Sequence, residues 1–220
     1  MAHRAEEKER RRQERIAQEE ASRKAAARRR TLQIGGGVVL GLAVIAAVAI
    51  VALAGGGGSK DKPADVSKLA ADAKAAGCTF SQFKSEGRNH TASKVVYKTN
   101  PPTSGNHNPT PAEDGIYRAG NSPPKENFVH TLEHGRIEFQ YKPGTSAADV
   151  AKLRRLAEEP FNGTAGYHVL LFENDTNMPA QFAATAWTKS ITCPTLSTQA
   201  IGAMREFRTA FTDKGPEFIP

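Results

Sequence analysis

The residues best suited to chemistry in this sequence are histidines, and they are clustered. Of the five histidines that follow residue 60, four lie between His90 and His134. Two of these four belong to the segment 127–135 (NFVHTLEHG), which is predicted to form one or two helical turns that Gly135 ends. Such a helix would place His130 and His134, four residues apart, on one face. Two imidazoles at that spacing can share one metal ion.

A loop is predicted to carry another histidine of this cluster. The segment 101–109 (PPTSGNHNP) cannot form a regular helix or a central strand, because each proline fixes φ and lacks an amide hydrogen. Gly105 permits a tight turn within it. We therefore expect an ordered loop that presents His107.

Composition excludes several other kinds of site. The chain has 220 residues, 30 Lys and Arg against 23 Asp and Glu, a net charge of +7 and only two cysteines. It has no phosphate-binding loop of Walker A spacing, no dinucleotide-binding glycine fingerprint and no two CxxC pairs, so nucleotide chemistry and a zinc ribbon are poorly supported. All of its aromatic residues follow residue 79, so the chain is built from unlike segments.

The N-terminal segments predict a membrane anchor. Residues 34–54 (IGGGVVLGLAVIAAVAIVALA) carry no polar side chain, and a helix of that length covers the roughly 30 Å of a bilayer core. The basic tail 1–33 ends close to Arg28, Arg29 and Arg30, which suit membrane topology better than nucleic-acid binding. We therefore expect a single-pass cell-membrane protein whose N-terminus is cytoplasmic, with the tail on the anionic inner leaflet and no nucleic-acid partner. The alternative is a signal peptide cleaved after Ala54.

The folded part is predicted to lie outside the membrane and to be closed by a disulfide. A Gly-rich linker, residues 55–65, precedes the domain 66–220. Cys78 and Cys193 are the only cysteines and would share the external compartment, so they most simply pair. The structural interpretation of this pair is favoured over a redox role, which would more often use a close CxxC pair.

The hydrophobic pattern of this domain predicts an α+β fold with a small mixed sheet and flanking helices. Helices are expected at 66–76, 147–159 and 196–212, and strands at 94–98, 136–141, 167–172 and 182–188. In segment 136–141, apolar residues alternate with Glu138 and Gln140, which is typical of a half-buried strand.

Several blocks of the sequence resemble a known family. These blocks are PPTSGNH at 101–107, GIY at 115–117, VHTLEHG at 129–135, AWT at 186–188 and GPE at 215–217. With the basic tail and the apolar segment, they resemble the membrane-anchored envelope proteins of the actinobacterial type that are grouped as domain of unknown function 3105. The resemblance covers about residues 76–220 and implies little about activity. It does imply a histidine pattern made of His90, His107, His130 and His134, with Glu133 between the last two.

The leading functional hypothesis is that these histidines bind a transition metal, either copper or zinc. Imidazole suits both ions, and no cluster of Cys or Met competes for a different assignment. Glu133 or Glu126 could be a further ligand or could orient an imidazole. His168 lies outside the pattern and is expected to be an ordinary half-buried side chain.

Three alternatives remain open at this level. The histidines could instead form a structural polar network with Glu133 or Glu126 that joins the loop to the helix. His130 to His134 also matches the H-x-x-E-H pattern of inverted zinc metallopeptidases, with Glu206 available downstream, although Gly135 ends the helix too early for that motif. Lastly, the Pro-rich loop, Tyr117 and Phe128 could present a surface to another envelope protein, without catalysis.

Overall fold

The structure is a computed structural model that describes residues 66–217 and residue 219. The predicted tail, membrane helix and linker lie outside these residues. Among the described residues, no helix combines the length and the apolar character needed to cross a bilayer.

A six-stranded mixed sheet forms the centre of the domain, as the sequence predicts. Its strands lie in the order β1 (Thr79–Gln82), β8 (Lys189–Cys193), β7 (Phe182–Ala186), β3 (Ile137–Tyr141), β6 (Val169–Glu173) and β2 (Gly115–Ile116). The pairs β3–β6 and β6–β2 are parallel, and the other three pairs are antiparallel. A separate hairpin is formed by β4 (Pro160–Phe161) and β5 (Thr164–Ala165).

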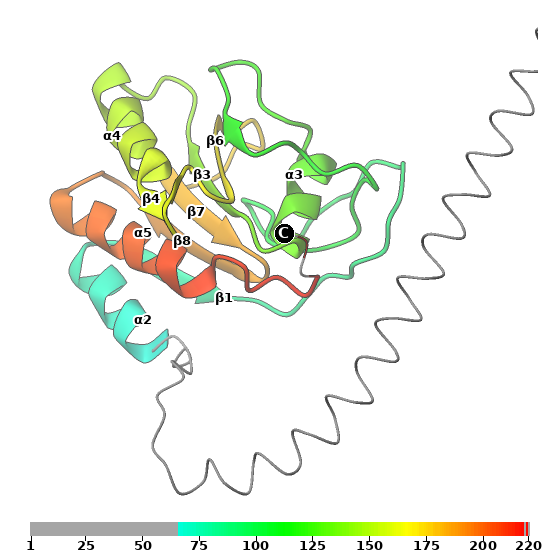
Figure 1. Cartoon of the computed structure of the whole chain (residues 1–220), viewed down its shortest axis with the longest axis horizontal. Coiled ribbons are helices and arrows are strands. Elements are labelled where there is room, and N and C mark those ends of the chain that lie inside the picture. The colour runs from blue at the N-terminus through cyan, green and yellow to red at the C-terminus, as the bar shows by residue number, and fades with distance from the viewer. Residues whose placement is uncertain (1–65, 218, 220) are drawn as a thin grey trace, which may run out of the picture. The chain divides into compact units, whose positions relative to one another are not determined.

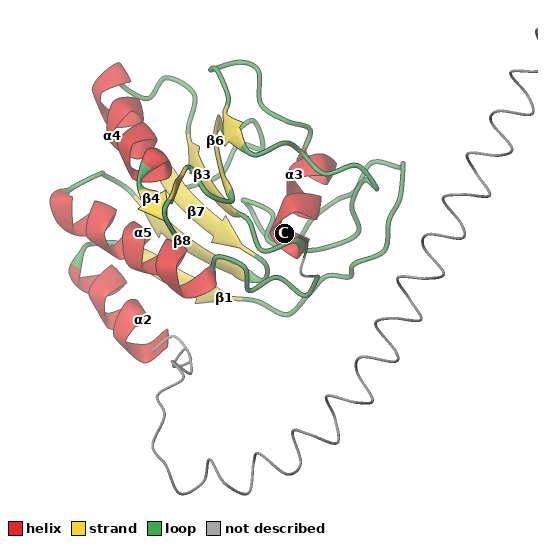
Figure 2. Cartoon of the chain, in the orientation of Figure 1, coloured by secondary structure: helices red, strands yellow, loops and turns green. Residues whose placement is uncertain are grey.

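Helices cover both faces of this sheet, so that the domain has three layers (Figures 1 and 2). On one face lie α2 (Val66–Ala75), α4 (Ala147–Glu158) and α5 (Thr198–Phe211), whose apolar residues pack against Ile137, Phe139 and Val169. On the other face, α3 (Lys125–Glu133) packs through Phe128, Val129 and Leu132 against Leu170 and Phe172. Alternate residues of β6 therefore belong to two separate cores.

The central strand β3 departs from the prediction in its burial. The two faces alternate as expected, but all five residues of β3 are buried, including Glu138 and Gln140. Their face of the sheet is covered by α3 rather than by solvent. The Glu138 carboxyl group is satisfied there by Thr131, Gln140 and Thr185, at distances of 2.8 to 3.0 Å.

Two other predictions of strands need correction. Residues 94–98 form a loop, because the backbone N–H groups of Val95 and Lys98 donate to the carboxylates of Glu126 and Glu86 instead of to a neighbouring strand. No strand was predicted at the segments that form β1, β2, β4, β5 and β8. The three helices and the three later strands that the pattern predicts are confirmed to within a few residues.

The disulfide between Cys78 and Cys193 is confirmed. It joins the residue just before β1 to the last residue of β8, so it connects two neighbouring strands at one edge of the sheet. The two cysteines are 115 residues apart, and Cys193 is completely buried. Most of the domain therefore lies within one covalent loop.

Candidate metal centre

The helix α3 carries two of the predicted ligands, His130 and Glu133, and a third, His134, is the residue that follows its last turn. It spans nine residues, and Gly135, with φ of +80°, adopts the left-handed conformation just beyond its end. The predicted common face is confirmed, since the Nε2 atoms of His130 and His134 lie 2.9 Å apart. Glu133, the last helical residue, has only 2% of its side chain exposed.

Two loops bring the remaining histidines to this helix. His90 and His107 form an isolated parallel bridge, in which Thr91 N–H donates to the His107 carbonyl oxygen and His107 N–H donates to that of Asn89. Residues 101–105 of the Pro-rich loop are buried, and His107 is completely buried. Gly105, with φ of +134°, is required there, because a Cβ atom at this position would lie 2.8 Å from the Tyr97 ring.

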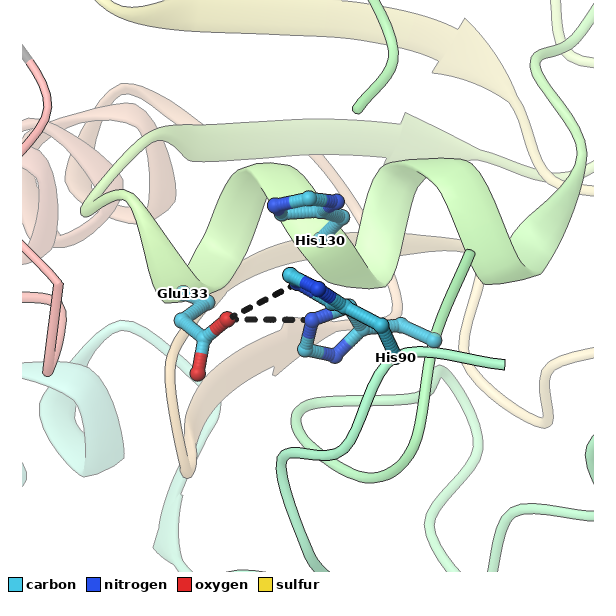
Figure 3. A group of neighbouring side chains, drawn as sticks. His90, His130 and Glu133 are labelled. Atoms are coloured by element: carbon cyan, nitrogen blue, oxygen red, sulfur yellow. Dashed lines mark ion pairs between the residues drawn. The ribbon is translucent and has the colours of Figure 1, made fainter. Parts of the chain in front are cut away.

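These elements assemble four potential ligands around one point. One donor atom from each of His90, His107, His130 and Glu133 lies within 4.8 Å of every other. The Glu133 Oε2 atom lies 3.0 Å from His107 Nε2 and 4.0 Å from His90 Nε2 (Figure 3). We call these four residues the inner group.

Backbone carbonyl groups fix the tautomers of two imidazoles. His107 Nδ1 lies 2.8 Å from the Gly105 carbonyl oxygen, and His130 Nδ1 lies 2.6 Å from that of Asn108. Since a carbonyl oxygen can only accept, both Nδ1 atoms carry the hydrogen. In the neutral rings, each Nε2 atom therefore has a lone pair, and that of His130 accepts a hydrogen bond from His134 Nε2 at 2.9 Å.

The His107 Nε2 atom lacks the partner that its burial demands. Within residues 66–217 and 219, it is one of two buried side-chain nitrogen or oxygen atoms with no hydrogen bond. The Glu133 oxygen is only 3.0 Å away, yet it does not lie in the direction of a hydrogen bond. In the neutral form of His107, its Nε2 lone pair and the Glu133 Oε2 atom would be two acceptors held side by side, an arrangement that a cation between them would relieve. Arg88 pairs with the other carboxylate oxygen, Oε1, at 3.4 Å.

The surroundings favour neutral imidazoles. Burial, reinforced by the positive charge that His134, His107 and His90 would carry, lowers the pKa of His130 to about 4, against the opposing effect of the Asn108 carbonyl group. Burial, followed by the nearby Arg136, also lowers the pKa of His134. Neutral imidazole is the form that binds metal ions, so His130 is ready to act as a ligand at pH 7.

The structure divides the five predicted ligands between two groups. His134 does not belong to the inner group, but it forms a second one with His130 and Glu217, whose donor atoms also lie within 4.8 Å of one another. We call this the outer group. Glu217 was not predicted as a ligand, although it lies in the GPE block at 215–217. No local pattern indicates that the C-terminal residues return to α3.

Other candidates lie elsewhere in the domain. Glu126 accepts from Val95 N–H and pairs with Lys94, away from the histidines. His168 is buried and pairs with Asp213, with 2.6 Å between Nδ1 and Oδ1. Phe128 is completely buried, so the prediction that it is exposed to a partner is wrong. Its aromatic ring packs on Phe172 instead.

The arrangement also bears on the peptidase alternative. In that motif the glutamate activates water beside the two histidines, whereas here the Glu133 carboxylate groups with His90, His107 and His130 and not with His134. Glu206, the downstream candidate, lies on α5 and pairs with Lys68 on α2. The geometry of the inner group therefore favours Glu133 as a ligand.

Comparison with known proteins gives one match. A family model described as Protein of unknown function (DUF3105) matches residues 89–218, a span that includes every residue of both groups. No curated protein and no solved structure matches the chain.

Proposed function

The chain belongs to the DUF3105 family, whose description assigns no activity, and we propose from its own geometry that the domain binds one transition-metal ion, zinc or copper, in the inner group. The ligands would be the Nε2 atoms of His107 and His130, a ring nitrogen of His90 and the Glu133 carboxylate. His134, which the sequence places in the same set, would complete the outer group instead.

The contact between His107 and Glu133 carries this proposal. Ligands that surround a tetrahedral zinc ion at about 2.0–2.1 Å are separated from one another by about 3.3 Å. They point at the ion and not at each other. The His107 Nε2 atom and the Glu133 oxygen, 3.0 Å apart without a hydrogen bond between them, match this relation.

The donor set supports zinc or copper over magnesium and calcium. Three imidazoles and one carboxylate are borderline ligands, whereas magnesium and calcium prefer oxygen ligands alone. Both cysteines are joined in the disulfide, so no thiolate competes. The carbonyl groups of Gly105 and Asn108 would orient His107 and His130 as ligands by accepting from their Nδ1 atoms.

A binding experiment with an exposed ligand tests the proposal. His90 has half of its side chain exposed, so His90→Ala should leave the fold intact. We expect the purified full-length chain to bind one zinc or copper ion, as measured by isothermal titration calorimetry. The H90A variant should bind the ion about 100-fold more weakly.

The control for this experiment is His168→Gln, which removes a histidine outside both groups. We expect H168Q to bind the ion as the unaltered chain does. Absence of binding by the unaltered chain, or equal affinity of H90A and the unaltered chain, would contradict the proposal. The histidines would then be a structural polar network.

We further propose that residues 34–54 anchor the chain in the cell membrane, with the tail 1–33 cytoplasmic and the domain 66–220 outside. The apolar composition of 34–54 and the basic residues before it support this placement. The Cys78–Cys193 disulfide also supports it, because disulfides persist in oxidising compartments. Protease added to intact cells should digest the domain and spare the tail, and protection of the domain would contradict this topology.

A further inference from the structure

The C-terminal segment, residues 213–217, lies against the end of α3 through its backbone (Figure 1). Asp213 N–H donates to the Gly135 carbonyl oxygen at 2.9 Å, and Glu217 N–H donates to that of Glu133 at 3.1 Å. The contact is so close that a Cβ atom on Gly215 would lie 2.1 Å from the Glu133 carbonyl oxygen. The position of Glu217 is therefore fixed by the same residue that supplies the carboxylate of the inner group.

This packing completes the outer group. The Glu217 Oε2 atom lies 3.6 Å from His134 Nε2, which in turn lies 2.9 Å from His130 Nε2. Two imidazoles and one carboxylate form a ligand set for the same class of ion as the inner group. The Glu217 side chain is 44% exposed, whereas Glu133 and His107 are buried.

One nitrogen atom belongs to both groups, and it can serve only one ion at a time. His130 Nδ1 donates its hydrogen to the Asn108 carbonyl oxygen, so the ring has a single lone pair, on Nε2. This lone pair cannot bind an ion in the outer group and a second ion in the inner group at the same time. The two groups are therefore alternative positions of one ion.

We propose that the outer group is a capture position, at which His134 and Glu217 take a divalent transition-metal ion from solution. The ion then passes to the inner group when His90, His107 and Glu133 replace His134 and Glu217, with His130 as the common ligand. This inference rests on the proposed function of the inner group. The ion keeps its charge throughout, and only the ligands around it change.

A capture position changes the rates at which the metal ion associates and dissociates, but it leaves the final complex, with the ion in the inner group, unchanged. Loss of the Glu217 carboxylate raises the barrier to both entry and exit, because the ion passes the same position in each direction. The association and dissociation rates should fall together, and Kd should stay the same. An ordinary ligand of the bound ion behaves differently, since its loss raises Kd and the dissociation rate.

The single tryptophan of the chain reports on this process. Trp187 lies with its ring centroid 6.2 Å from that of His107, close enough for a bound Cu²⁺ ion to quench its fluorescence. Stopped-flow mixing of the full-length chain with Cu²⁺ gives the association rate, and mixing of the loaded chain with excess chelator gives the dissociation rate. Glu217→Gln is the test variant, and Glu158→Gln, which removes an exposed carboxylate on α4, is the matched control.

We expect E217Q to lower both rates by about tenfold, with Kd unchanged, and E158Q to match the unaltered chain. Unaltered rates in E217Q would overturn the capture position, as would a raised Kd with an unaltered association rate, which would make Glu217 an ordinary ligand. Either result leaves the inner group in place. Failure of Cu²⁺ to bind the unaltered chain would instead overturn the proposed function, and the capture position with it.

Discussion

His130 connects the chemistry of the site to the stability of the domain. It is 3% exposed, its Nδ1 atom is engaged by Asn108, and its Nε2 atom belongs to both ligand groups. A buried imidazole that stays neutral in the folded chain binds a proton more readily in the unfolded chain, so its presence makes stability depend on pH.

The pKa of His130 therefore predicts acid sensitivity of the metal-free domain. The pKa is about 4 in the folded chain against an ordinary 6.5, so the unfolded chain binds more protons between these values. The free energy of unfolding should fall as pH drops from 6.5 towards 4, by about 2 kcal/mol after allowance for solvent screening. Urea unfolding with chelator present measures this, and His130→Gln should flatten the dependence. An equally steep fall in H130Q would contradict the assignment.

Glu138 predicts a dependence of the opposite sign. Burial raises the pKa of its carboxyl group well above 4.5, against the opposing effect of hydrogen bonds with Thr185, Thr131 and Gln140. The Thr131 hydroxyl lies 2.6 Å from the Phe128 carbonyl oxygen, to which it donates its one hydrogen, so a protonated Glu138 can donate to the Thr131 oxygen. The unfolded chain loses this proton above pH 4.5 while the folded chain keeps it.

The resulting prediction concerns Glu138→Gln, which keeps the shape of the neutral carboxyl group. The free energy of unfolding of the unaltered chain should decrease relative to that of E138Q as pH rises above 4.5. Urea midpoints of both proteins at pH 5 and pH 8 measure the difference. If the two proteins lost or gained stability in parallel, Glu138 would be ionised in the folded chain.

At the scale of single residues, the sequence predicts which side chains belong to the candidate site better than it predicts how they divide between the inner and the outer group. The four clustered histidines and Glu133 all lie in the inner or the outer group. They could be predicted because their residue types and spacing are typical of metal ligands. Glu217 could not be found in this way. Its place depends on backbone contacts with Gly135 and Glu133, about 80 residues earlier in the chain, which no local pattern encodes.

At the scale of elements, the end of α3 and the C-terminal segment form one unit. Gly135 has φ of +80°, and a Cβ atom there would lie 2.8 Å from the Asp213 Cα atom. Gly144 has nearly the same φ, +78°, with nothing within 4 Å of such an atom. The two glycines thus separate the effect of backbone conformation from the effect of packing.

We expect Gly135→Ala to destabilise the domain more than Gly144→Ala does. Both variants place a side chain in the left-handed region, at about 1 kcal/mol each, but only G135A displaces the C-terminal segment, for at least about 1 kcal/mol more. Urea unfolding of the two variants gives this difference directly. Equal destabilisation by G135A and G144A would show that the C-terminal segment moves away at no cost in free energy and that Glu217 is not held in place.

The elements themselves were predictable where one physical signal dominates. The amphipathic helices α4 and α5 follow from their apolar spacing, and α2 ends at the glycine that the pattern indicates. Segment 94–98 has the composition of a strand, but Glu86 and Glu126 bind its amide groups. The burial of β3 depends on a second layer, α3, and the pattern of one strand cannot show what covers its polar face.

At the scale of the whole molecule, the disulfide is the feature most directly linked to stability. The 115-residue separation of Cys78 and Cys193 restricts the unfolded chain strongly. Replacing both with Ala should lower the free energy of unfolding by about 4–5 kcal/mol in the loop-entropy account. The measurement is urea unfolding of the double variant beside the oxidised chain, and an unchanged midpoint would show that the closed loop contributes little.

The whole-molecule architecture followed from the sequence in outline only. The α+β class and the mixed sheet are confirmed, as is the pairing of Cys78 with Cys193. The strand order could not be predicted from the sequence, because it depends on contacts between distant segments such as β1 with β8 and β2 with β6. The membrane anchor stays a prediction that rests on residues 34–54.

The most direct test of the central claim is the X-ray absorption spectrum of the zinc-loaded full-length chain and of its His90→Ala variant at the zinc edge. A zinc ion in the inner group should show nitrogen and oxygen neighbours at about 2.0–2.1 Å, with scattering from about three imidazoles that decreases to about two in H90A. Oxygen neighbours alone, or the same number of imidazoles in both proteins, would contradict an ion bound by His90, His107, His130 and Glu133.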